Sequence, residues 1–189
     1  KSSSAVSATK QQPSTNVIAD GSAIRFEVMT KNSGIDFVVD GGPTPLANMP
    51  EQNGRGVALF DFDNDSILDL FFVGGKLADP SEGKTPTPGR HRLYRGLGNW
   101  RFEEVTEQSG LNQPVPGMGM GCSAGDFDND GAVDLFVAGY RFFQLWRNNG
   151  DGTFQNVTKL LGSATPLWST SAAFADLDAD GYLDLFVVN

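Results

Sequence analysis

The segment DFDNDGAVDL, from Asp126 to Leu135, is the second of three copies of one acidic motif in this chain. The other copies are DFDNDSILDL from Asp61 and DLDADGYLDL from Asp176. Each copy has aspartate at positions 1, 3, 5 and 9 and runs into a short apolar segment rich in Phe, Leu and Val. Together they hold twelve of the 23 acidic residues, so negative charge is concentrated in these loops.

Alternate carboxylates on a tightly turned backbone converge on one point, where they repel one another unless a cation joins them. Calcium takes about six to eight oxygen ligands in a tolerant geometry, whereas magnesium fits less well and zinc favours His or Cys. By analogy with other acidic calcium loops, position 7 supplies a backbone carbonyl. The motif therefore predicts about three calcium sites, with these ligands: Asp61, Asp63, Asp65, Ile67 and Asp69; Asp126, Asp128, Asp130, Ala132 and Asp134; Asp176, Asp178, Asp180, Tyr182 and Asp184.

The acidic motif has two other interpretations, an EF-hand loop and a solvated hairpin turn. An EF-hand loop ends in Glu at position 12 and leads into a helix, but position 12 here is Phe72, Val137 or Val187. The alternative is a solvated hairpin turn, because Asp, Asn and Gly favour turns for local reasons. Three copies with one spacing, each before the same kind of apolar run, favour calcium binding.

Position 6 of the motif requires a sharp turn. Gly131 and Gly181 provide it because glycine tolerates a positive φ. Ser66 stands at this position in the first copy, where a left-handed conformation would cost about 1 kcal/mol. We therefore expect the first site to be weaker or slightly reshaped.

Other segments repeat together with the acidic motif. RFEEVTEQSGL from Arg101 matches TFQNVTKLLG from Thr153, and HRLYRGLGNWRF from His91 matches FQLWRNNGDGTF from Phe143. The repeated unit then consists of four short strands, with the acidic turn between the first two. Four-stranded units repeated at 50 to 65 residues, the spacing between successive motifs, are typical of β-propeller blades.

These segments resemble the FG-GAP or VCBS repeat family of integrin-type β-propellers, in which a D-x-D-x-D-G-x-x-D calcium loop joins the first two strands of a blade. GVALFDFDND, RLYRGLGNWRFEEVTEQSGL and GMGMGCSAGDFDND are closer still to its ASPIC/UnbV subgroup of proteins similar to cartilage acidic protein. The resemblance covers roughly residues 24 to 189. It departs from the family pattern at Ser66, and at Met29, where the other copies have Val105 and Val157.

The predicted fold class is all-β, with about two and a half blades of a larger propeller. The expected parts are a flexible Ser-rich tail (1–23), a lone fourth strand (24–37), two blades (55–108 and 118–160) and a half blade (168–189). Because propellers close with about four to eight blades, we expect the remaining blades in a longer polypeptide or in other chains.

Composition narrows the classes of partner. A net charge of −9 with no basic stripe argues against nucleic acid, and no apolar run is long enough to span a membrane. Calcium loops of low affinity suit a secreted, periplasmic or cell-surface location.

His91, the only histidine, is expected at a solvent-facing or edge position. Trp100, Tyr94 and Trp146 lie in repeated strand segments and are expected to pack between blades.

The resulting functional hypothesis is an extracellular β-propeller with structural calcium ions that acts as a non-catalytic binding or assembly module. A protein or carbohydrate would bind one propeller face, and other chains would complete the assembly. Two alternatives stay open. One is the propeller part of a secreted, lyase-like carbohydrate-active enzyme, which rests on analogy of fold alone. The other is a structural subunit of a surface complex.

Overall fold

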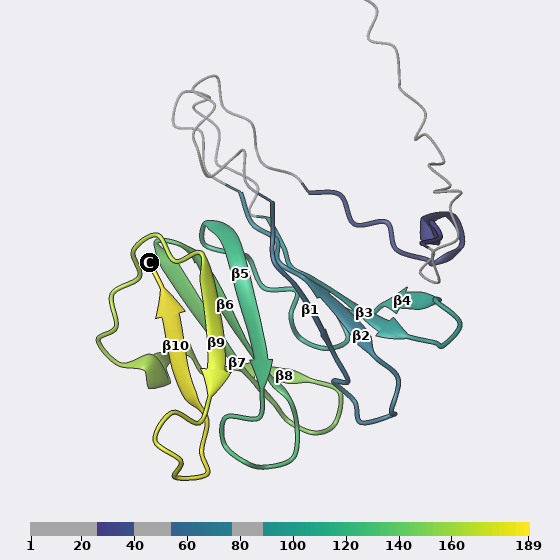
Figure 1. The fold of residues 1–189 in the computed structure, drawn as a ribbon. Coiled ribbons are helices and arrows are strands. Elements are labelled where there is room, and N and C mark those ends of the chain that lie inside the picture. Colours follow the sequence, from purple (N-terminus) through teal and green to yellow (C-terminus); the bar gives the residue numbers. More distant parts are fainter. Residues whose placement is uncertain (1–25, 40–53, 77–88) are drawn as a thin grey trace, which may run out of the picture.

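The computed structural model describes residues 26–39, 54–76 and 89–189. The expected tail (1–23) lies outside these residues. The described chain is all-β, with two four-stranded antiparallel sheets and one two-stranded sheet placed side by side (Figure 1). Its only helical segments are two 3₁₀ turns, η1 (Thr30–Asn32) and η3 (Thr158–Leu161). Among the described residues, no helix is long and apolar enough to cross a membrane.

The strands follow the repeat, in the order first to fourth within each blade. The first blade contains β1 (Val57–Phe60), β2 (Asp69–Phe72), β3 (Arg92–Gly96) and β4 (Phe102–Glu104). The second blade contains β5 (Met118–Gly125), β6 (Asp134–Tyr140), β7 (Phe142–Asn148) and β8 (Phe154–Asn156). The two-stranded sheet contains β9 (Ser171–Ala175) and β10 (Asp184–Val188). The predicted all-β fold with partial propeller blades is confirmed.

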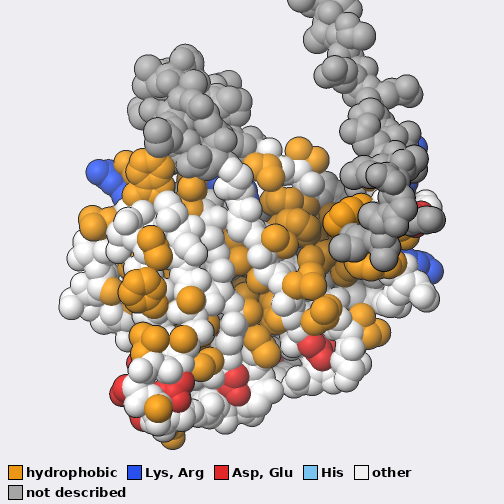
Figure 2. Space-filling model, in the orientation of Figure 1, with side chains coloured by type: hydrophobic (Ala, Val, Ile, Leu, Met, Phe, Trp, Pro, Cys, Tyr) orange, Lys and Arg blue, Asp and Glu red, His pale blue; other side chains and the backbone are white. Residues whose placement is uncertain are grey.

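Each acidic motif forms the turn between the first two strands of its sheet. The strand register pairs Phe60 with Asp69, Gly125 with Asp134, and Ala175 with Asp184, so the ninth residue of each motif begins the second strand. The three turns lie at the same edge of the sheets, where acidic side chains gather in the space-filling view (Figure 2). This arrangement places three equivalent loops in a row.

The core lies between the sheets. One cluster joins the first two blades through Phe71, Leu93, Leu135 and Trp146, all fully buried. A second cluster joins the second blade to the two-stranded sheet around Phe136. Because both faces of the second blade are covered, the first six residues of β6 are all buried. Burial of these apolar side chains against neighbouring sheets stabilises the stack.

Glycines allow the first strands of neighbouring sheets to approach closely. A Cβ atom on Gly121 in β5 would lie 2.5 Å from the carbonyl oxygen of Thr170, and one on Gly119 would lie 2.4 Å from that of Gly74. The backbone N–H of Gly56 also donates a hydrogen bond of 2.6 Å to the carbonyl oxygen of Met120. The glycine-rich segment before the second acidic loop therefore serves close packing of strands.

The prediction of a lone fourth strand in residues 24–37 is wrong for the described part of this segment. Residues 26–29 form no strand and are followed by η1; Phe26 is 91% exposed. A β-strand requires a hydrogen-bonded neighbour, and the described strand pairings do not include these residues. The turn that follows nevertheless repeats. The hydroxyl of Ser33 donates to the carbonyl oxygen of Thr30 at 3.1 Å, as that of Ser109 does to Thr106 at 3.1 Å.

Two aromatic expectations are also corrected. Tyr94 and Trp146 are buried as expected, but Trp100 is 69% exposed because it lies in the left-handed turn of the β3–β4 hairpin, with φ of 59°. His91 is fully buried between the first two blades. Its Nδ1 accepts a hydrogen bond of 3.0 Å from the backbone N–H of Gly74, so Nε2 carries the proton and donates to Gln144 at 2.8 Å. His91 therefore links the blades instead of facing solvent.

Candidate metal sites

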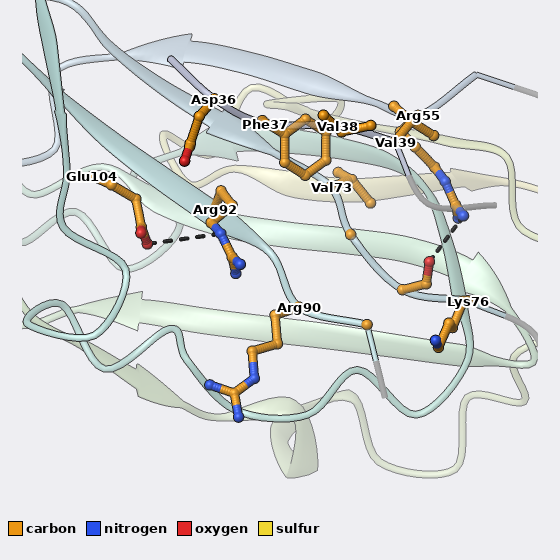
Figure 3. A pocket seen from close by; sticks show the side chains of 13 residues that line it. Asp36, Phe37, Val38, Val39, Arg55, Val73, Lys76, Arg90, Arg92 and Glu104 are labelled. Carbon is orange, nitrogen blue, oxygen red and sulfur yellow. Dashed lines mark hydrogen bonds and ion pairs between the residues drawn. The ribbon is translucent and has the colours of Figure 1, made fainter. Parts of the chain in front are cut away.

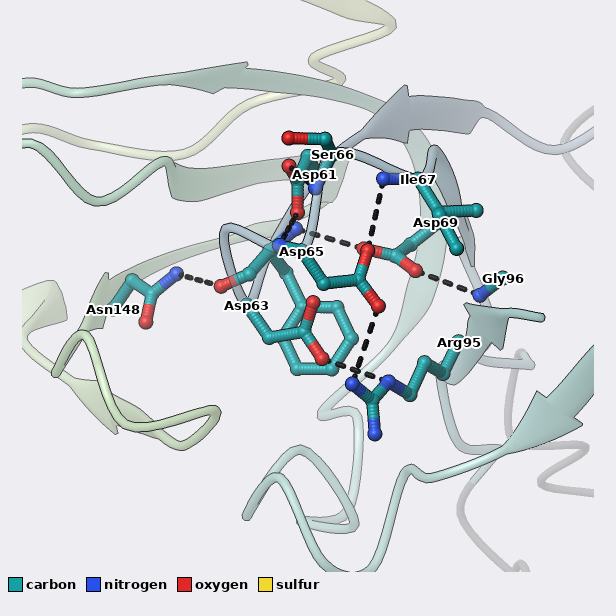
Figure 4. Close-up of polar contacts among 10 residues, drawn as sticks. Asp61, Asp63, Asp65, Ser66, Ile67, Asp69, Arg95, Gly96 and Asn148 are labelled. Carbon is teal, nitrogen blue, oxygen red and sulfur yellow. Dashed lines mark hydrogen bonds and ion pairs between the residues drawn. The ribbon is translucent and has the colours of Figure 1, made fainter. Parts of the chain in front are cut away.

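Backbone hydrogen bonds to aspartate shape each acidic loop. In the first loop, the two carboxylate oxygens of Asp61 accept the N–H groups of Asp65 and Ser66 at 3.1 and 2.8 Å (Figure 4). The N–H of Ile67 donates to Asp65 at 2.8 Å. Asp69 closes the loop by accepting the N–H of Phe62 at 2.8 Å. The aspartates at positions 1, 5 and 9 therefore stabilise the turn by accepting backbone hydrogen bonds.

The second and third loops repeat this network almost unchanged. The N–H at position 6 donates to the carboxylate at position 1 over 2.9 and 3.0 Å, and the N–H at position 7 donates to position 5 over 2.9 and 2.8 Å. The N–H at position 2 donates to the aspartate at position 9 over 2.9 and 3.0 Å. Three copies of one sequence pattern thus adopt one conformation.

Two positions in every loop adopt left-handed backbone conformations. At position 6, Ser66, Gly131 and Gly181 have φ of 68°, 89° and 91°. The expected left-handed turn is therefore present, and Ser66 adopts it despite its side chain. Position 4 is left-handed as well, at Asn64, Asn129 and Ala179, with φ of 58°, 58° and 61°. Sequence reasoning overlooked position 4, although asparagine in two copies was a signal because asparagine tolerates this region better than most residues.

Three of the four aspartates in each loop meet. Carboxylate oxygens at positions 1, 3 and 9 lie within 4.8 Å of one another in all three loops: Asp61, Asp63 and Asp69; Asp126, Asp128 and Asp134; Asp176, Asp178 and Asp184. The aspartates at position 5, which are Asp65, Asp130 and Asp180, are not part of these groups. The carbonyl ligands assigned to Ile67, Ala132 and Tyr182 stay a prediction. The structure therefore assembles a three-carboxylate core for each predicted site.

An arginine from the third strand contacts the loop in each four-stranded blade. In the first blade, Nε of Arg95 lies 2.8 Å from Asp63 and Nη2 lies 3.2 Å from Asp65 (Figure 4). In the second blade, Arg147 contacts Asp128 and Asp130 over the same two distances. Hydrogen bonds from Ala132 and Arg147 lower the pKa of Asp130. The arginine thus forms an ion pair with the position-5 carboxylate beside the three-carboxylate group.

The position-3 carboxylates have oxygens that would fit a bound cation. Oδ1 of Asp63 and Oδ1 of Asp128 are buried and have no hydrogen-bond donor among the described residues. A buried anionic oxygen without a partner is costly. Both aspartates belong to groups whose other members are carboxylates, so a cation is a partner that would satisfy these oxygens. An all-oxygen donor set of this kind fits calcium.

The ninth position carries the most buried carboxylates. Asp69 and Asp134 are fully buried and accept backbone N–H groups from the third strand, Gly96 at 2.7 Å and Asn148 at 2.8 Å. Burial raises the pKa of each to about 6, opposed by these hydrogen bonds and reinforced by the neighbouring carboxylates of the same loop. A bound dication would counteract this repulsion.

The third loop is less enclosed. Asp184 is exposed, and no described arginine contacts Asp178 or Asp180. In the other loops the arginine and the second backbone donor to position 9 come from the third strand, and the described part of this sheet has two strands. The neighbouring blade compensates in part, because the side-chain amide of Asn129 donates to the carbonyl oxygen of Gly181 at 2.9 Å.

A cavity of about 400 Å³ lies at the other end of the first blade, where β2 ends and β3 begins (Figure 3). Apolar side chains, including Phe37 and Val73, form part of its wall. Arg55 is fixed there by hydrogen bonds of 2.7 and 2.9 Å to the carbonyl oxygens of Gly119 and Gly75. The described residues of the wall include charged side chains of both signs: Arg55, Lys76, Arg90, Arg92, Asp36 and Glu104.

Comparison with known proteins identifies the repeat. The FG-GAP-like repeat family matches residues 81–137 and 126–187, which together cover more than half of the chain. These ranges contain the second and third acidic loops, and the first loop lies outside them.

Three curated relatives share the name cartilage acidic protein 1. The mouse protein is 28% identical over 168 residues, and the alignment covers 82% of this chain and 24% of the relative. The human protein is 27% identical over 168 residues, with 82% and 23% covered. The Xenopus tropicalis protein is 27% identical over 169 residues, with 83% and 24% covered. The chain therefore spans about a quarter of the length of the curated relatives it matches.

Proposed function

This chain belongs to the FG-GAP-like repeat family, and we propose that it forms part of a calcium-stabilised β-propeller that acts outside the cytosol as a non-catalytic binding or assembly module. The observation that carries the proposal is the unpartnered Oδ1 atom of Asp63 and of Asp128, each buried within a group of three carboxylates. Two loops with the same unsatisfied atom at the same position have the chemistry of a cation site.

The proposed calcium ions are structural. Each would bind aspartates that already hold the turn between two strands, so the ion would fasten the acidic edge of the sheet and offset the repulsion among carboxylates. The aspartates would serve as ligands and not as proton donors, since coordination stabilises the ionised carboxylate. Loops of this kind work where free calcium is about millimolar, which supports a secreted or cell-surface location.

The proposed partner surface is the cavity at the end of the first blade, away from the acidic loops. Apolar side chains such as Phe37 and Val73 beside charged ones would suit a partner that has both apolar and polar groups, such as a protein or a carbohydrate. A rigid, calcium-fastened sheet would hold the cavity walls in place for such a partner.

Calcium stoichiometry tests the proposed function. The protein freed of metal and titrated with calcium is expected to bind about three ions, one per acidic loop. Asp128→Asn removes a charge and keeps the shape of the side chain, so it is expected to remove or strongly weaken one site. Asp151→Asn is the control, because Asp151 caps an exposed hairpin through Thr153 and lies outside the acidic loops. Absence of calcium binding, or equal binding by Asp128→Asn and the unchanged protein, would refute the proposal.

A further inference from the structure

Arg95 and Arg147 occupy equivalent places in β3 and β7, and each contacts the acidic loop of its own blade in the same way. Nε approaches the position-3 aspartate at 2.8 Å, and Nη2 approaches the position-5 aspartate at 3.2 Å. The contacts therefore repeat in atoms as well as in distances. Such repetition distinguishes these pairs from incidental contacts between long surface side chains.

The arginine engages one oxygen of the position-3 carboxylate and leaves the other free. Oδ2 of Asp63 pairs with Arg95 and Oδ2 of Asp128 pairs with Arg147. Oδ1 of each aspartate is buried without a donor among the described residues, and each aspartate belongs to a three-carboxylate group. In this arrangement Oδ2 faces the arginine and Oδ1 is the oxygen left for a cation.

We propose that Arg95 and Arg147 are built-in counter-ions that keep the acidic loops folded without calcium and thereby lower the affinity of the loops for calcium. This inference rests on the proposed calcium sites. A guanidinium next to two of the four carboxylates supplies part of the charge that the metal would otherwise provide. The same positive charge repels an incoming dication. The arginine therefore stabilises the metal-free loop and lowers its affinity for calcium.

Thermodynamic linkage fixes the direction of the effect. Loss of the arginine removes the only described cation next to the empty loop, whereas in the loaded loop calcium still neutralises the carboxylates. The empty folded protein is therefore destabilised more than the loaded one. A ligand that binds only the folded state must then bind the variant more tightly. A unit charge about 6 Å from a dication in a water-like dielectric changes binding by about tenfold.

The test uses the full chain carrying both Arg95→Met and Arg147→Met. Arg92→Met is the matched control, because Arg92 lies on the same strand as Arg95 but is 3.9 Å from Glu104 and contacts no acidic loop. A third protein carries both Arg95→Lys and Arg147→Lys, which keep the charge but lose the fork that spans two carboxylates. Melting temperature is measured in chelator and in saturating calcium, and calcium affinity is measured by competition with a chromogenic chelator.

The methionine variant is expected to melt about 5 °C lower in chelator and to lose less than half as much in calcium. Two of its three sites are expected to tighten by about tenfold, and the lysine variant is expected to lie between it and the unchanged protein. Unchanged melting in chelator, or unchanged or weaker calcium binding, would overturn the inference. Such a result would mean that these half-exposed pairs are ordinary surface salt bridges. Failure of calcium to bind the unchanged protein would instead refute the proposed function.

Discussion

The side-chain amide of Asn148 donates a hydrogen bond of 2.8 Å to the backbone carbonyl of Phe62. Asn148 ends the third strand of the second blade, and Phe62 is the second residue of the acidic loop of the first blade. The backbone N–H of Asn148 also donates to Asp134 of its own loop at 2.8 Å. One buried residue therefore joins two neighbouring acidic loops.

We predict that Asn148→Ala lowers the free energy of unfolding by about 2 kcal/mol, because it leaves the carbonyl oxygens of Phe62 and Val133 without their buried donor. Urea unfolding at constant calcium measures the change. Asn149→Ala is the control, because its amide reaches only the exposed hydroxyl of Thr153. Equal effects of the two substitutions would contradict a linking role for Asn148.

Ser66→Gly is predicted to stabilise the protein by about 0.5–1 kcal/mol, because Ser66 has φ of 68° and glycine adopts this region without steric cost. Gly131→Ser is the reciprocal change at the same position of the second loop. A Cβ atom on Gly131 meets nothing within 4 Å, so only backbone strain should count there. Chemical unfolding of both variants checks the prediction, which fails if Ser66→Gly is destabilising.

Gly121→Ala is predicted to destabilise the protein by about 1–3 kcal/mol, because the added Cβ would lie 2.5 Å from the carbonyl oxygen of Thr170 and push two first strands apart. Gly54→Ala adds the same methyl group where nothing lies within 4 Å and is expected to be nearly neutral. Urea midpoints of the two variants are compared. Tolerance of alanine at position 121 would show that the sheets can separate at little cost.

The free energy of unfolding is predicted to fall at acidic pH because of His91. Burial lowers the pKa of His91 to about 4, below the ordinary value of about 6.5. The unfolded chain therefore takes up the proton first. The contribution of neutral His91 is complete above pH 6.5 and is lost as pH falls toward 4, by about 3 kcal/mol over the whole window.

His91→Gln isolates this contribution, because it removes the titrating group while the carboxylates still titrate. Unfolding free energies of both proteins are measured from pH 7.5 to pH 4.5 at constant calcium. We expect a steeper loss in the protein that retains His91. Parallel pH profiles would mean that His91 is readily protonated in the folded state.

The strand order and the place of the acidic loops could be predicted because they depend on local pattern. The spacing from Asp126 to Asp134 fixes the turn, and the apolar run after it forms the buried β6. The prediction of a strand at Phe26–Thr30 failed because strand formation depends on a non-local partner. The sequence of this segment matches a fourth strand, but pairing requires a neighbouring strand, and only the turn at Ser33 forms from local contacts.

The contacts around the sites depended on tertiary structure and escaped sequence analysis. Arg95 and Arg147 align in the repeat, so their recurrence was visible, but their contact with the loop depends on how the third strand lies beside the turn. The position-5 aspartates stay predicted ligands; the structure shows Asp65 and Asp130 in ion pairs with these arginines. His91 replaces Phe143 of the second blade in the alignment, and no local pattern reveals that Gln144 lies opposite it.

Calcium-dependent thermal stability tests the central claim most directly. The protein is melted in excess chelator, in millimolar calcium and in millimolar magnesium at the same ionic strength. The calcium sites predict a melting temperature that rises strongly with calcium, rises less with magnesium and returns to the chelated value when calcium is removed. A melting temperature that is the same in chelator and in calcium would contradict the assignment of these acidic loops as calcium sites.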